Sequence, residues 1–592
     1  MIAALAPFAA LALCAAPWVM LASRRFGAML AGLGALCGIP LLVLFVLLAT
    51  APLGLDPLAC VLALSAMLGA LGLVLVLRER GALRRPSRLT VARWLPATAG
   101  ALVWLGTLGA AHLLPRADAL SWAMNGDGAN NIHLARVILA DHGFALPASY
   151  AVPLPNVLLA LAMAPGRSAD LAAGDLLRHD LTAFGAFWAL AFAATAVLLG
   201  LTASSLLQRG ALRIGIASAG GSLLVATWFI AGLPIESGYL NVHVALPFAL
   251  ASWLAFLQSR RHGVASTVVI LACGLLMLTA WAPLIAITLG LLAAIAARGQ
   301  WRRVRVRVAV PVAIVAAVGL LWFVVVAAPA LGTSSGAFTT PGHGYPSTML
   351  LFALCAAVAI GSAVALRRQA DLPVLRGTVY LSLAAAAALT AMLVLAGGSS
   401  GALTSYYFSK LSWLFTVVLL AVAVAGLVRL VAERRGGTVS VGIVVAAVLA
   451  LCTLGPAPTR DNFRIDQPLD RILSARVWNN GDETVDTILA NTGRDEPVLF
   501  WQSSSPDEAM IDFWLLEFNG GAIGGNDAVR GFSIEAYREF RDRGSYTPPP
   551  VGALCAVVTG LDRAVVVVTA NAQLDEELDQ ACPSARVTIR RE

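Results

Sequence analysis

The sequence predicts a polytopic α-helical membrane protein with a C-terminal α/β domain. Hydrophobic residues make up 59% of its 592 residues, charged residues only 12%, and the mean hydropathy is +0.81. This composition is typical of chains that cross a bilayer many times. The second observation is the distribution of acidic residues, because 22 of the 33 follow residue 455. We therefore expect a membrane region followed by a soluble one.

Apolar runs of roughly 17 to 23 residues are long enough to cross the hydrocarbon core as helices, and about 14 of them are predicted. The least certain boundary divides residues 264–298 at Trp281-Ala-Pro283. The runs begin near Ile2, Ala28, Leu58, Leu95, Leu181, Ile214, Asn241, Val264, Trp281, Val308, Met349, Gly377, Leu411 and Thr438.

Arginine-rich loops follow every odd-numbered predicted helix. Arginine in short loops marks the cytoplasmic side of a membrane, so these seven loops are predicted to be cytoplasmic. Both termini and the longer loops, including residues 115–180, then lie outside the cytoplasm. The net charge of +8 thus reflects membrane orientation, and no nucleic acid partner is expected. The basic loops are residues 24–25, 78–93, 209–213, 260–261, 298–307, 367–376 and 429–435.

Three regions follow from this pattern. Residues 1–94 hold the first three helices and a basic loop, residues 95–455 form a transmembrane core, and residues 456–592 form the extracytoplasmic α/β domain. In that domain, strands are predicted at 497–501, 554–558, 564–569 and 586–589, between helical stretches. Its two cysteines, Cys555 and Cys582, are disulfide candidates in an oxidising compartment, although the sequence leaves their pairing open.

Asp127 is the candidate catalytic residue. It lies in the first large outer loop, among polar side chains that are costly near hydrocarbon unless they are used or satisfied. These neighbours are Asn125, Asn130, Asn131, His133 and Arg136. The alternative is that Asp127 caps a helix by accepting a backbone N–H. Apolar residues at helical spacing after Asp127 predict a short surface helix, and a second one is expected over residues 171–180.

Two further segments carry polar residues on the predicted outer face. The hairpin from Pro234 to His243 contains Glu236 and Tyr239, which alternatively anchor the chain at the membrane interface. The segment Tyr406-Tyr407-Phe-Ser-Lys410 holds the only lysine of the chain, on a face predicted to avoid positive charge. Such a cation suits a phosphate group, but it also suits a snorkelling anchor.

A metal is neither excluded nor required. No two histidines have the spacing of a zinc site on one helix. A divalent cation (magnesium, manganese or calcium) bridging Asp127 and a phosphate is compatible with the sequence, and no cofactor is demanded by it.

The expected chemistry is glycosyl transfer. Outside a bacterial cell the donor must be lipid-linked, and transfer needs a base for the acceptor hydroxyl and a cation for the leaving phosphate. The layout resembles the GT-C superfamily of polyprenyl-phosphate-sugar-dependent glycosyltransferases, and loosely the actinobacterial cell-wall arabinofuranosyltransferases. Three segments carry the resemblance: Asp127-Gly-Ala-Asn-Asn-Ile-His-Leu-Ala-Arg136, Pro234-Ile-Glu236-Ser-Gly-Tyr239 and Tyr406-Tyr-Phe-Ser-Lys410. The Glu-to-Tyr spacing is one residue longer than in the family, and the last basic residue is lysine.

The resemblance implies a role for each residue. Asp127 would be the general base or a metal-linked acid, Arg136 and Lys410 would contact the donor phosphate, and Glu236 and Tyr239 would shape the acceptor side. The remaining expected substrate-binding residues are Asn125, Asn130, His133, His243, Tyr406 and Tyr407. The implied partners are a polyprenyl-phosphate sugar, an envelope glycan and membrane lipid, at the bacterial cytoplasmic membrane. The alternatives are a flippase or transporter for a lipid-linked glycan and a non-catalytic envelope-assembly scaffold.

Overall fold

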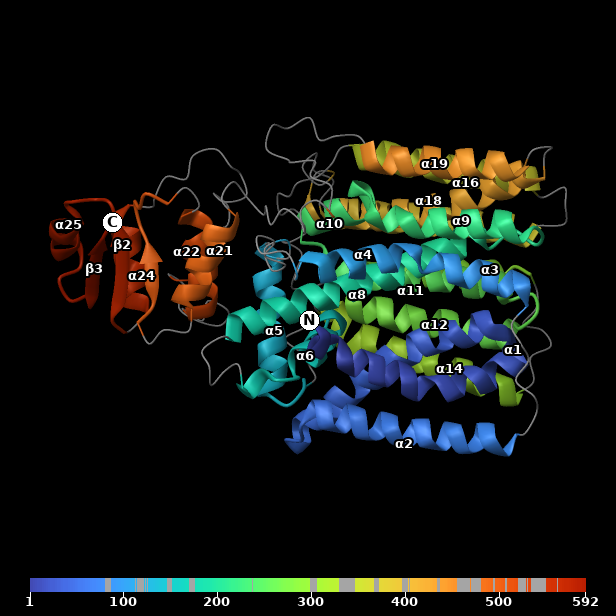
Figure 1. The fold of residues 1–592 in the computed structure, drawn as a ribbon, viewed down its shortest axis with the longest axis horizontal. Helices are drawn as coiled ribbons and strands as arrows, with labels where there is room; N and C mark the ends of the chain where they lie inside the picture. The colour runs from blue at the N-terminus through green and yellow to red at the C-terminus, as the bar shows by residue number, and fades with distance from the viewer. Residues whose placement is uncertain are drawn as a thin grey trace.

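The computed structural model is a long helical bundle with a small α/β unit beyond one end (Figure 1). Its described part contains 11 helices long and apolar enough to cross a membrane, or 12 if a bent pair counts as one span. The chain is therefore a polytopic helical membrane protein. The described residues are 1–79, 87–111, 113, 122, 124, 126–145, 152–169, 176–236, 238–298, 306–329, 347–366, 372–396, 403, 405–433, 437–454, 469, 481–492, 496–505, 508–519, 529, 531–533, 550–561 and 563–592.

The elements follow one another along the chain with short connections between most helices of the bundle. The helices of the membrane region are α1 (Ile2–Thr50), α2 (Pro57–Arg78), α3 (Arg88–Ala97), α4 (Ala99–Ala111), α5 (Gly126–Ala140), α6 (Leu154–Met163), α8 (Leu176–Ser204), α9 (Ala211–Leu223), α10 (Leu233–Glu236), α11 (Leu240–Gln258), α12 (Gly263–Ala280), α13 (Ile285–Ala296), α14 (Val306–Trp322), α16 (Ser347–Leu366), α17 (Leu372–Leu395), α18 (Tyr406–Ala432) and α19 (Gly437–Leu454). The helices and strands of the C-terminal unit are α21 (Gly481–Asn491), β1 (Val498–Phe500), α22 (Glu508–Asn519), α24 (Val551–Gly560), β2 (Val565–Thr569), α25 (Leu574–Ala581) and β3 (Val587–Arg591).

Helix α1 is two helical segments that meet at Gly27. The backbone there has φ 81° and ψ 156°, a conformation that glycine adopts without the steric cost of a side chain. The first segment runs parallel to α2, because Trp18 donates to the Leu68 carbonyl and Arg24 pairs with Glu79. The second segment leads back to Thr50, close to the start of α2. The chain therefore reverses at Gly27, where the sequence predicts the boundary between its first two helices.

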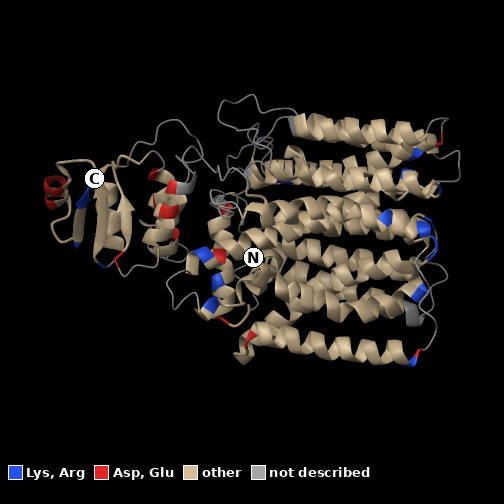
Figure 2. Ribbon diagram, in the orientation of Figure 1, with Lys and Arg blue, Asp and Glu red and all other residues tan. Residues whose placement is uncertain are grey.

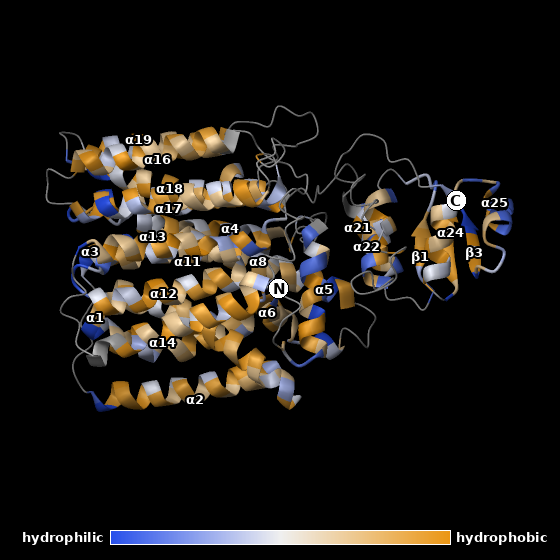
Figure 3. Ribbon diagram, turned by 180° about the vertical axis from the view of Figure 1, so that it is seen from behind, coloured by the Kyte–Doolittle hydropathy of each residue, from blue (hydrophilic) through white to orange (hydrophobic). Residues whose placement is uncertain are grey.

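The two ends of the bundle differ in charge, as Figure 2 shows. At one end, which we call the basic end, contacts join several of the arginine-rich loops. Arg93 donates to the carbonyls of Ser204 and Leu207, and Arg213 donates to that of Ala432. The other end carries α5, α6 and the C-terminal unit, and we call it the domain end (Figure 1). Apolar residues dominate the helices between the two ends (Figure 3). The described arginine-rich loops thus share one end, as expected if they follow every odd-numbered membrane helix.

The structure corrects two expectations for the loop 115–180. Residues 154–163 form the buried helix α6, although prolines such as Pro153 and Pro155 predict a break in regular structure here. Residues 176–180 are the first turns of the long helix α8 rather than part of a separate surface helix. The buried run of apolar residues in α6 is too short to cross a bilayer, which is why its length gives no transmembrane signal.

The C-terminal unit is built on a three-stranded parallel sheet in the order β1-β2-β3. Side chains of a strand alternate between its two faces, and both faces are covered here. Leu499, Val565 and Val567 belong to one core with residues of α24 and α25. Val498, Val566 and Val568 belong to the core that includes α22 and continues into the bundle. A sheet buried on both faces explains the uninterrupted valine run of β2.

The predicted strand at 554–558 is wrong, because these residues belong to helix α24. Its buried residues are Leu554, Val557 and Val558, which have the i, i+3, i+4 spacing of a helix face. Short apolar runs cannot be assigned to helix or strand from hydrophobicity alone. The helix begins after Pro550 and packs this face against α25 and the sheet.

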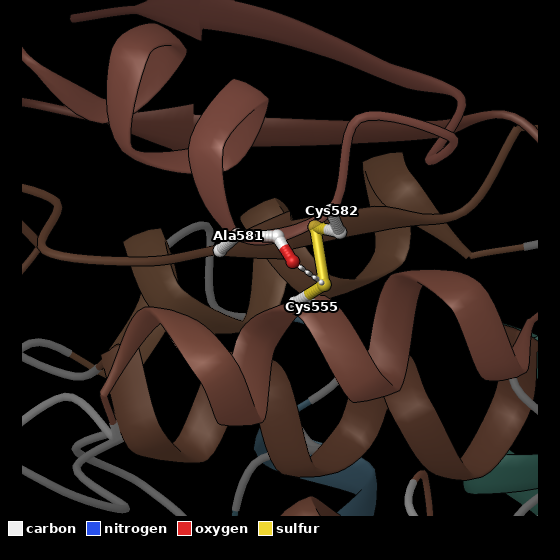
Figure 4. Close-up of a disulfide and its surroundings, with 3 residues drawn as sticks. All are labelled: Cys555, Ala581 and Cys582. Atoms are coloured by element: carbon white, nitrogen blue, oxygen red, sulfur yellow. Dashed lines mark hydrogen bonds between the residues drawn. A yellow bond between two sulfur atoms is a disulfide. The ribbon is translucent and has the colours of Figure 1, made fainter.

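Cys555 and Cys582 form a disulfide in the structure, with their Cα atoms 5.8 Å apart (Figure 4). The bond joins α24 to the residue after α25, and Cys555 Sγ also lies 3.6 Å from the carbonyl oxygen of Ala581. It thereby ties together two helices on the same face of the sheet.

Close helix contacts in the bundle depend on small residues. The Gly100 N–H donates to Ser222 Oγ at 2.8 Å, and that hydroxyl donates to the Ala97 carbonyl at 2.6 Å. A Cβ atom on Gly100 would overlap the carbonyl oxygen of Ser222 and lie 2.8 Å from its carbonyl carbon. The contact between α4 and α9 therefore requires glycine at position 100.

We predict that Gly100→Ala destabilises the protein by about 1–3 kcal/mol, the usual cost of forcing atoms into a packed core. This cost outweighs the helix preference of alanine over glycine, which is about 1 kcal/mol. The control is Gly106→Ala on the same helix, where a Cβ meets no atom within 4 Å. Denaturation of the detergent-solubilised variants should show a loss only for Gly100→Ala. Equal stabilities for the two variants would contradict the packing argument.

Candidate active site

Helix α5, which carries Asp127, is held against α8 by a buried carboxylate. Asp180 in α8 is 0% exposed and accepts hydrogen bonds from Arg136 Nε, at 2.6 Å, and from Arg167. A buried carboxylate is tolerated because two guanidinium groups face it. Since Arg136 lies nine residues after Asp127, a helix places the two about 13 Å apart along its axis. This ion cluster therefore fixes the position of α5 at the domain end.

The C-terminal unit contacts the same arginine. The guanidinium of Arg136 lies over the ring of Phe518 in α22, 4.6 Å from its centroid. Helix α22 is itself bound to the sheet, because Asp512 accepts the Phe500 N–H at 2.7 Å and Glu508 accepts the Ser503 N–H at 2.6 Å. Burial raises the pKa of both carboxyl groups above their usual values. The soluble unit is thus coupled through Phe518 to the helix that carries Asp127.

A break in a helix positions the second segment of the site. After α9 the chain turns at Thr227, whose backbone is extended, and the flanking helices are bent by 49°. Carbonyls released at the break are satisfied by buried indoles: Trp104 Nε1 donates to Val225 and Trp413 Nε1 donates to Phe229. Non-helical backbone at membrane depth requires such partners. The break leads into α10 and the hairpin that contains Tyr239.

Tyr239 is buried at the end of this hairpin. Gly238 has φ 67°, and the Tyr239 N–H donates to the Pro234 carbonyl at 2.8 Å, so the turn folds the ring inward. The Tyr239 ring is 1% exposed and packs edge-on against that of Tyr406, with 5.3 Å between centroids. Burial of this kind argues against a simple anchor in the membrane interface.

Asp127 meets residues of α18 in the first turn of α5. The Tyr406 hydroxyl donates to Asp127 Oδ2, and Lys410 Nζ lies 4.0 Å from the same oxygen. Lys410 also donates to the Tyr406 hydroxyl at 3.1 Å, one helical turn away. Its ammonium lies 5.2 Å from the Tyr239 ring centroid and 4.6 Å from that of Tyr406. Four side chains from three segments thus form one cluster, which we call the Asp127 cluster: Asp127, Tyr239, Tyr406 and Lys410.

Exposure differs sharply within the Asp127 cluster. The Lys410 side chain is 4% exposed, whereas that of Asp127 is 38% exposed and can be reached from outside the helices. Partial desolvation raises the pKa of Asp127 above its usual 3.8, and this effect outweighs the opposing effects of Lys410 and the Tyr406 hydrogen bond. A carboxylate with a raised pKa is a stronger base than an ordinary aspartate. The cluster therefore combines an accessible base with a buried cation.

The described partners of the Asp127 carboxylate come from α18, which distinguishes it from a capping residue that serves its own helix. Within α5, Asn131 instead donates its side-chain amide to the Asp127 carbonyl at 2.7 Å. His133 is half-buried, and its pKa is lowered by desolvation and by Arg136. Asn130 is exposed. Asn125 and the side chain of Glu236 lie outside the described residues.

His243 lies deeper among aromatic rings, whereas Tyr407 is half-buried beside Tyr406. His243 is 0% exposed, and its ring lies 4.2 Å from that of Phe192 and 5.8 Å from that of Trp413, centroid to centroid. The Tyr407 ring stacks on Trp281 at 6.3 Å and meets Tyr406 edge-on at 5.3 Å. His243 thus lies in the packed core beneath the Asp127 cluster, and its expected contact with a substrate stays a prediction.

The described residues contain no group of three or more histidine, cysteine, aspartate or glutamate side chains arranged to hold a metal. At Asp127, the ammonium of Lys410 faces the oxygen that a bridging cation would need. The divalent cation that the sequence allows between Asp127 and a phosphate therefore stays a prediction, and the described side chains carry the chemistry proposed below.

Sequence reasoning missed two components of the site. Asp180 falls in a stretch expected to be a surface helix, and its burial could not be read from the sequence. The contact of Phe518 with Arg136 joins residues far apart in the chain, for which no sequence signal exists. The apolar pattern of α22 is apparent in the sequence, but the surface against which this helix packs is not.

Comparison with known proteins adds no assignment. No family model, curated protein or solved structure matches this chain. The class that the fold defines is a polytopic helical membrane protein with a polar cluster at the domain end.

We predict that Asp180→Ala costs about 3–5 kcal/mol of stability, because it leaves two buried or half-buried guanidinium groups without their carboxylate. The matched control is Asp486→Ala. Asp486 is 72% exposed and lies 3.9 Å from Arg178, so its loss should cost less than about 1 kcal/mol. Thermal unfolding in detergent would compare the variants. Equal losses would show that Asp180 does not hold α5 in place.

Proposed function

We propose that this chain is a membrane glycosyltransferase of GT-C type, which moves a sugar from a polyprenyl phosphate to an envelope glycan or lipid acceptor. The observation that carries the proposal is the Asp127 cluster. An accessible carboxylate lies beside a buried ammonium at the end of a membrane bundle. Transfer from a lipid-linked donor needs a base and a phosphate-binding cation at the headgroup level.

In the proposed reaction, Asp127 accepts the proton of the acceptor hydroxyl. The acceptor oxygen forms a bond to the anomeric carbon of the sugar, and the bond between that carbon and the phosphate oxygen breaks. The bonding electrons leave with the phosphate, so polyprenyl phosphate departs with one more negative charge. No oxidant or reductant is consumed, and the proton remains on Asp127 until it passes to solvent.

Lys410 is proposed to stabilise the charge that develops on the leaving phosphate. A buried ammonium interacts more strongly with an anion than a solvated one does, because water screens it less. The Tyr406 hydroxyl links Lys410 to Asp127 and orients both groups. Tyr239 covers the other side of the ammonium, which favours the charged form through its ring.

The orientation in the membrane is part of the proposal. Arginines at the basic end favour a cytoplasmic location for that end, by the usual distribution of positive charge. The disulfide between Cys555 and Cys582 favours an oxidising compartment for the domain end. We therefore propose that this is a bacterial plasma membrane protein with 14 membrane helices, a number that counts the two segments of α1 separately and includes α13. Its C-terminal domain would be extracytoplasmic and would orient the glycan.

The flippase and the scaffold remain the alternatives. A flippase would move lipid-linked sugar without forming a glycosidic bond, and a scaffold would do neither. Reconstituted vesicles with a radiolabelled polyprenyl-phosphate sugar, beginning with arabinofuranose, distinguish the three. A labelled glycan product supports the transferase. Movement of label between leaflets without product supports the flippase, and the absence of both supports the scaffold.

We predict that Asp127→Asn lowers the transfer rate by about 10²–10⁴-fold, the usual contribution of a general base. The control is Asp141→Asn, the same change at an exposed residue one position beyond α5. Both variants should keep the melting temperature of the native protein. Unchanged turnover in Asp127→Asn would refute the assignment of the base.

We also predict a defined pH effect. Activity requires the ionised carboxylate, so it falls as pH drops through the pKa of Asp127, which lies above that of an ordinary aspartate. The Tyr406 hydrogen bond lowers this pKa. Tyr406→Phe should therefore move the acid limb of kcat/KM to higher pH, while Tyr380→Phe in α17 should leave it in place. An unmoved limb in Tyr406→Phe would show that the titrating group is not Asp127.

A further inference from the structure

Two cavities near the basic end share a wall, and neither belongs to the Asp127 cluster. The first has a volume of about 930 Å³ and is lined by Arg93, Arg260, Arg261 and Arg298, with no acidic side chain among its described lining residues. The second has a volume of about 1020 Å³ and is lined mainly by apolar and small side chains of α1, α2 and α12. Phe26 lines both cavities, so the polar space opens beside the apolar one.

Among the described residues, no acidic side chain pairs with the arginines of the first cavity. Arg93 donates to the Ser204 and Leu207 carbonyls, at 3.2 and 2.6 Å. Arg298 donates to Ser259 Oγ at 2.8 Å and to the Pro373 carbonyl at 3.3 Å. All four partner groups are neutral, so they orient the guanidinium groups without cancelling their charge.

Arg260 and Arg261 border the same space and are exposed. Positive charges gathered in one cavity repel each other, and an anion that enters it relieves this repulsion. Guanidinium groups bind phosphate through paired hydrogen bonds, which makes phosphate the favoured anion.

The second cavity has the form of a groove for a hydrocarbon chain. It follows the second segment of α1 from Leu30 to Leu42, a distance of about 18 Å at the rise of an α-helix. One leaflet contributes about half of the 30 Å hydrocarbon core, so the groove is long enough for an acyl chain. Gly34 and Gly38 open the groove, since a Cβ atom on either would meet nothing within 4 Å.

We propose that an anionic lipid from the leaflet at the basic end binds here, with its phosphate in the arginine-lined cavity and a hydrocarbon chain in the groove. A soluble phosphate compound would use only the first cavity and would leave the apolar groove without a role. The continuity of the two cavities at Phe26 therefore favours a lipid. This inference goes beyond the proposed glycosyl transfer and does not depend on Asp127.

The test measures lipid affinity of the full chain in detergent by native mass spectrometry. The probes are dioleoyl phosphatidylglycerol, dioleoyl phosphatidylcholine and soluble glycerol phosphate. We expect phosphatidylglycerol to bind more tightly than phosphatidylcholine, and glycerol phosphate not to displace it. If phosphatidylcholine binds as tightly as phosphatidylglycerol, or more tightly, the proposed role of the arginines is overturned. Full displacement by glycerol phosphate would overturn the lipid in favour of a soluble anion.

Two pairs of matched variants locate the site. Arg260→Gln with Arg261→Gln should raise the Kd of phosphatidylglycerol by about 30-fold, or about fivefold for each arginine near a phosphate. Arg78→Gln with Arg209→Gln removes the same charge from exposed positions at this end that do not line the cavity, and should leave the Kd unchanged. Equal weakening by both pairs would show diffuse surface attraction and overturn the proposal.

The groove is tested by Gly34→Leu, which fills it, against Gly106→Leu on α4, which also adds a side chain where no atom lies within 4 Å. Only Gly34→Leu should weaken phosphatidylglycerol binding. If both variants bind phosphatidylglycerol as tightly as the native protein does, the hydrocarbon chain of the lipid does not occupy the groove and the proposal fails. Monodisperse elution and an unchanged melting temperature establish that each variant is folded.

Discussion

The buried carboxylate of Asp180 is the constraint on which the domain end of the molecule depends. Two arginines, Arg136 and Arg167, converge on it, and Arg136 also lies against Phe518 of the C-terminal unit. A charge at this depth is stable only while its partners stay in place. Helix α5, the start of α8 and helix α22 are therefore coupled through one ion cluster, and the position of Asp127 follows from it.

The Asp127 cluster shows how a bundle of apolar helices can hold polar chemistry at its end. Asp127 and Tyr406 are 279 residues apart in sequence, and Lys410 reaches both because it lies one turn after Tyr406. The hairpin that brings Tyr239 to them follows a broken helix whose free carbonyls are satisfied by tryptophans. Two carbonyls at this break are thus matched by hydrogen bonds from α4 and α18, as the low dielectric of the membrane demands.

The opposite end of the bundle carries a different set of charges. There Arg93 and Arg298 are held by carbonyl and hydroxyl oxygens, and the cavity that they line meets an apolar groove at Phe26. Arginines of the loops that are predicted to be cytoplasmic also line a cavity at this end. Topology signal and binding site are compatible roles, because the first depends on charge alone and the second on where the fold places it.

The sequence by itself determined the class of protein, the approximate helices, the change to a soluble composition after residue 455, and the separate candidacy of Asp127, Tyr239 and Lys410. These follow from length, hydropathy and isolated polar residues, which are local properties. Only the tertiary structure decided that these three side chains meet, that Asp180 is buried between arginines, and that residues 554–558 are helical. Those facts depend on which surfaces pack together, and a sequence pattern records the period of an apolar face but not the partner that covers it.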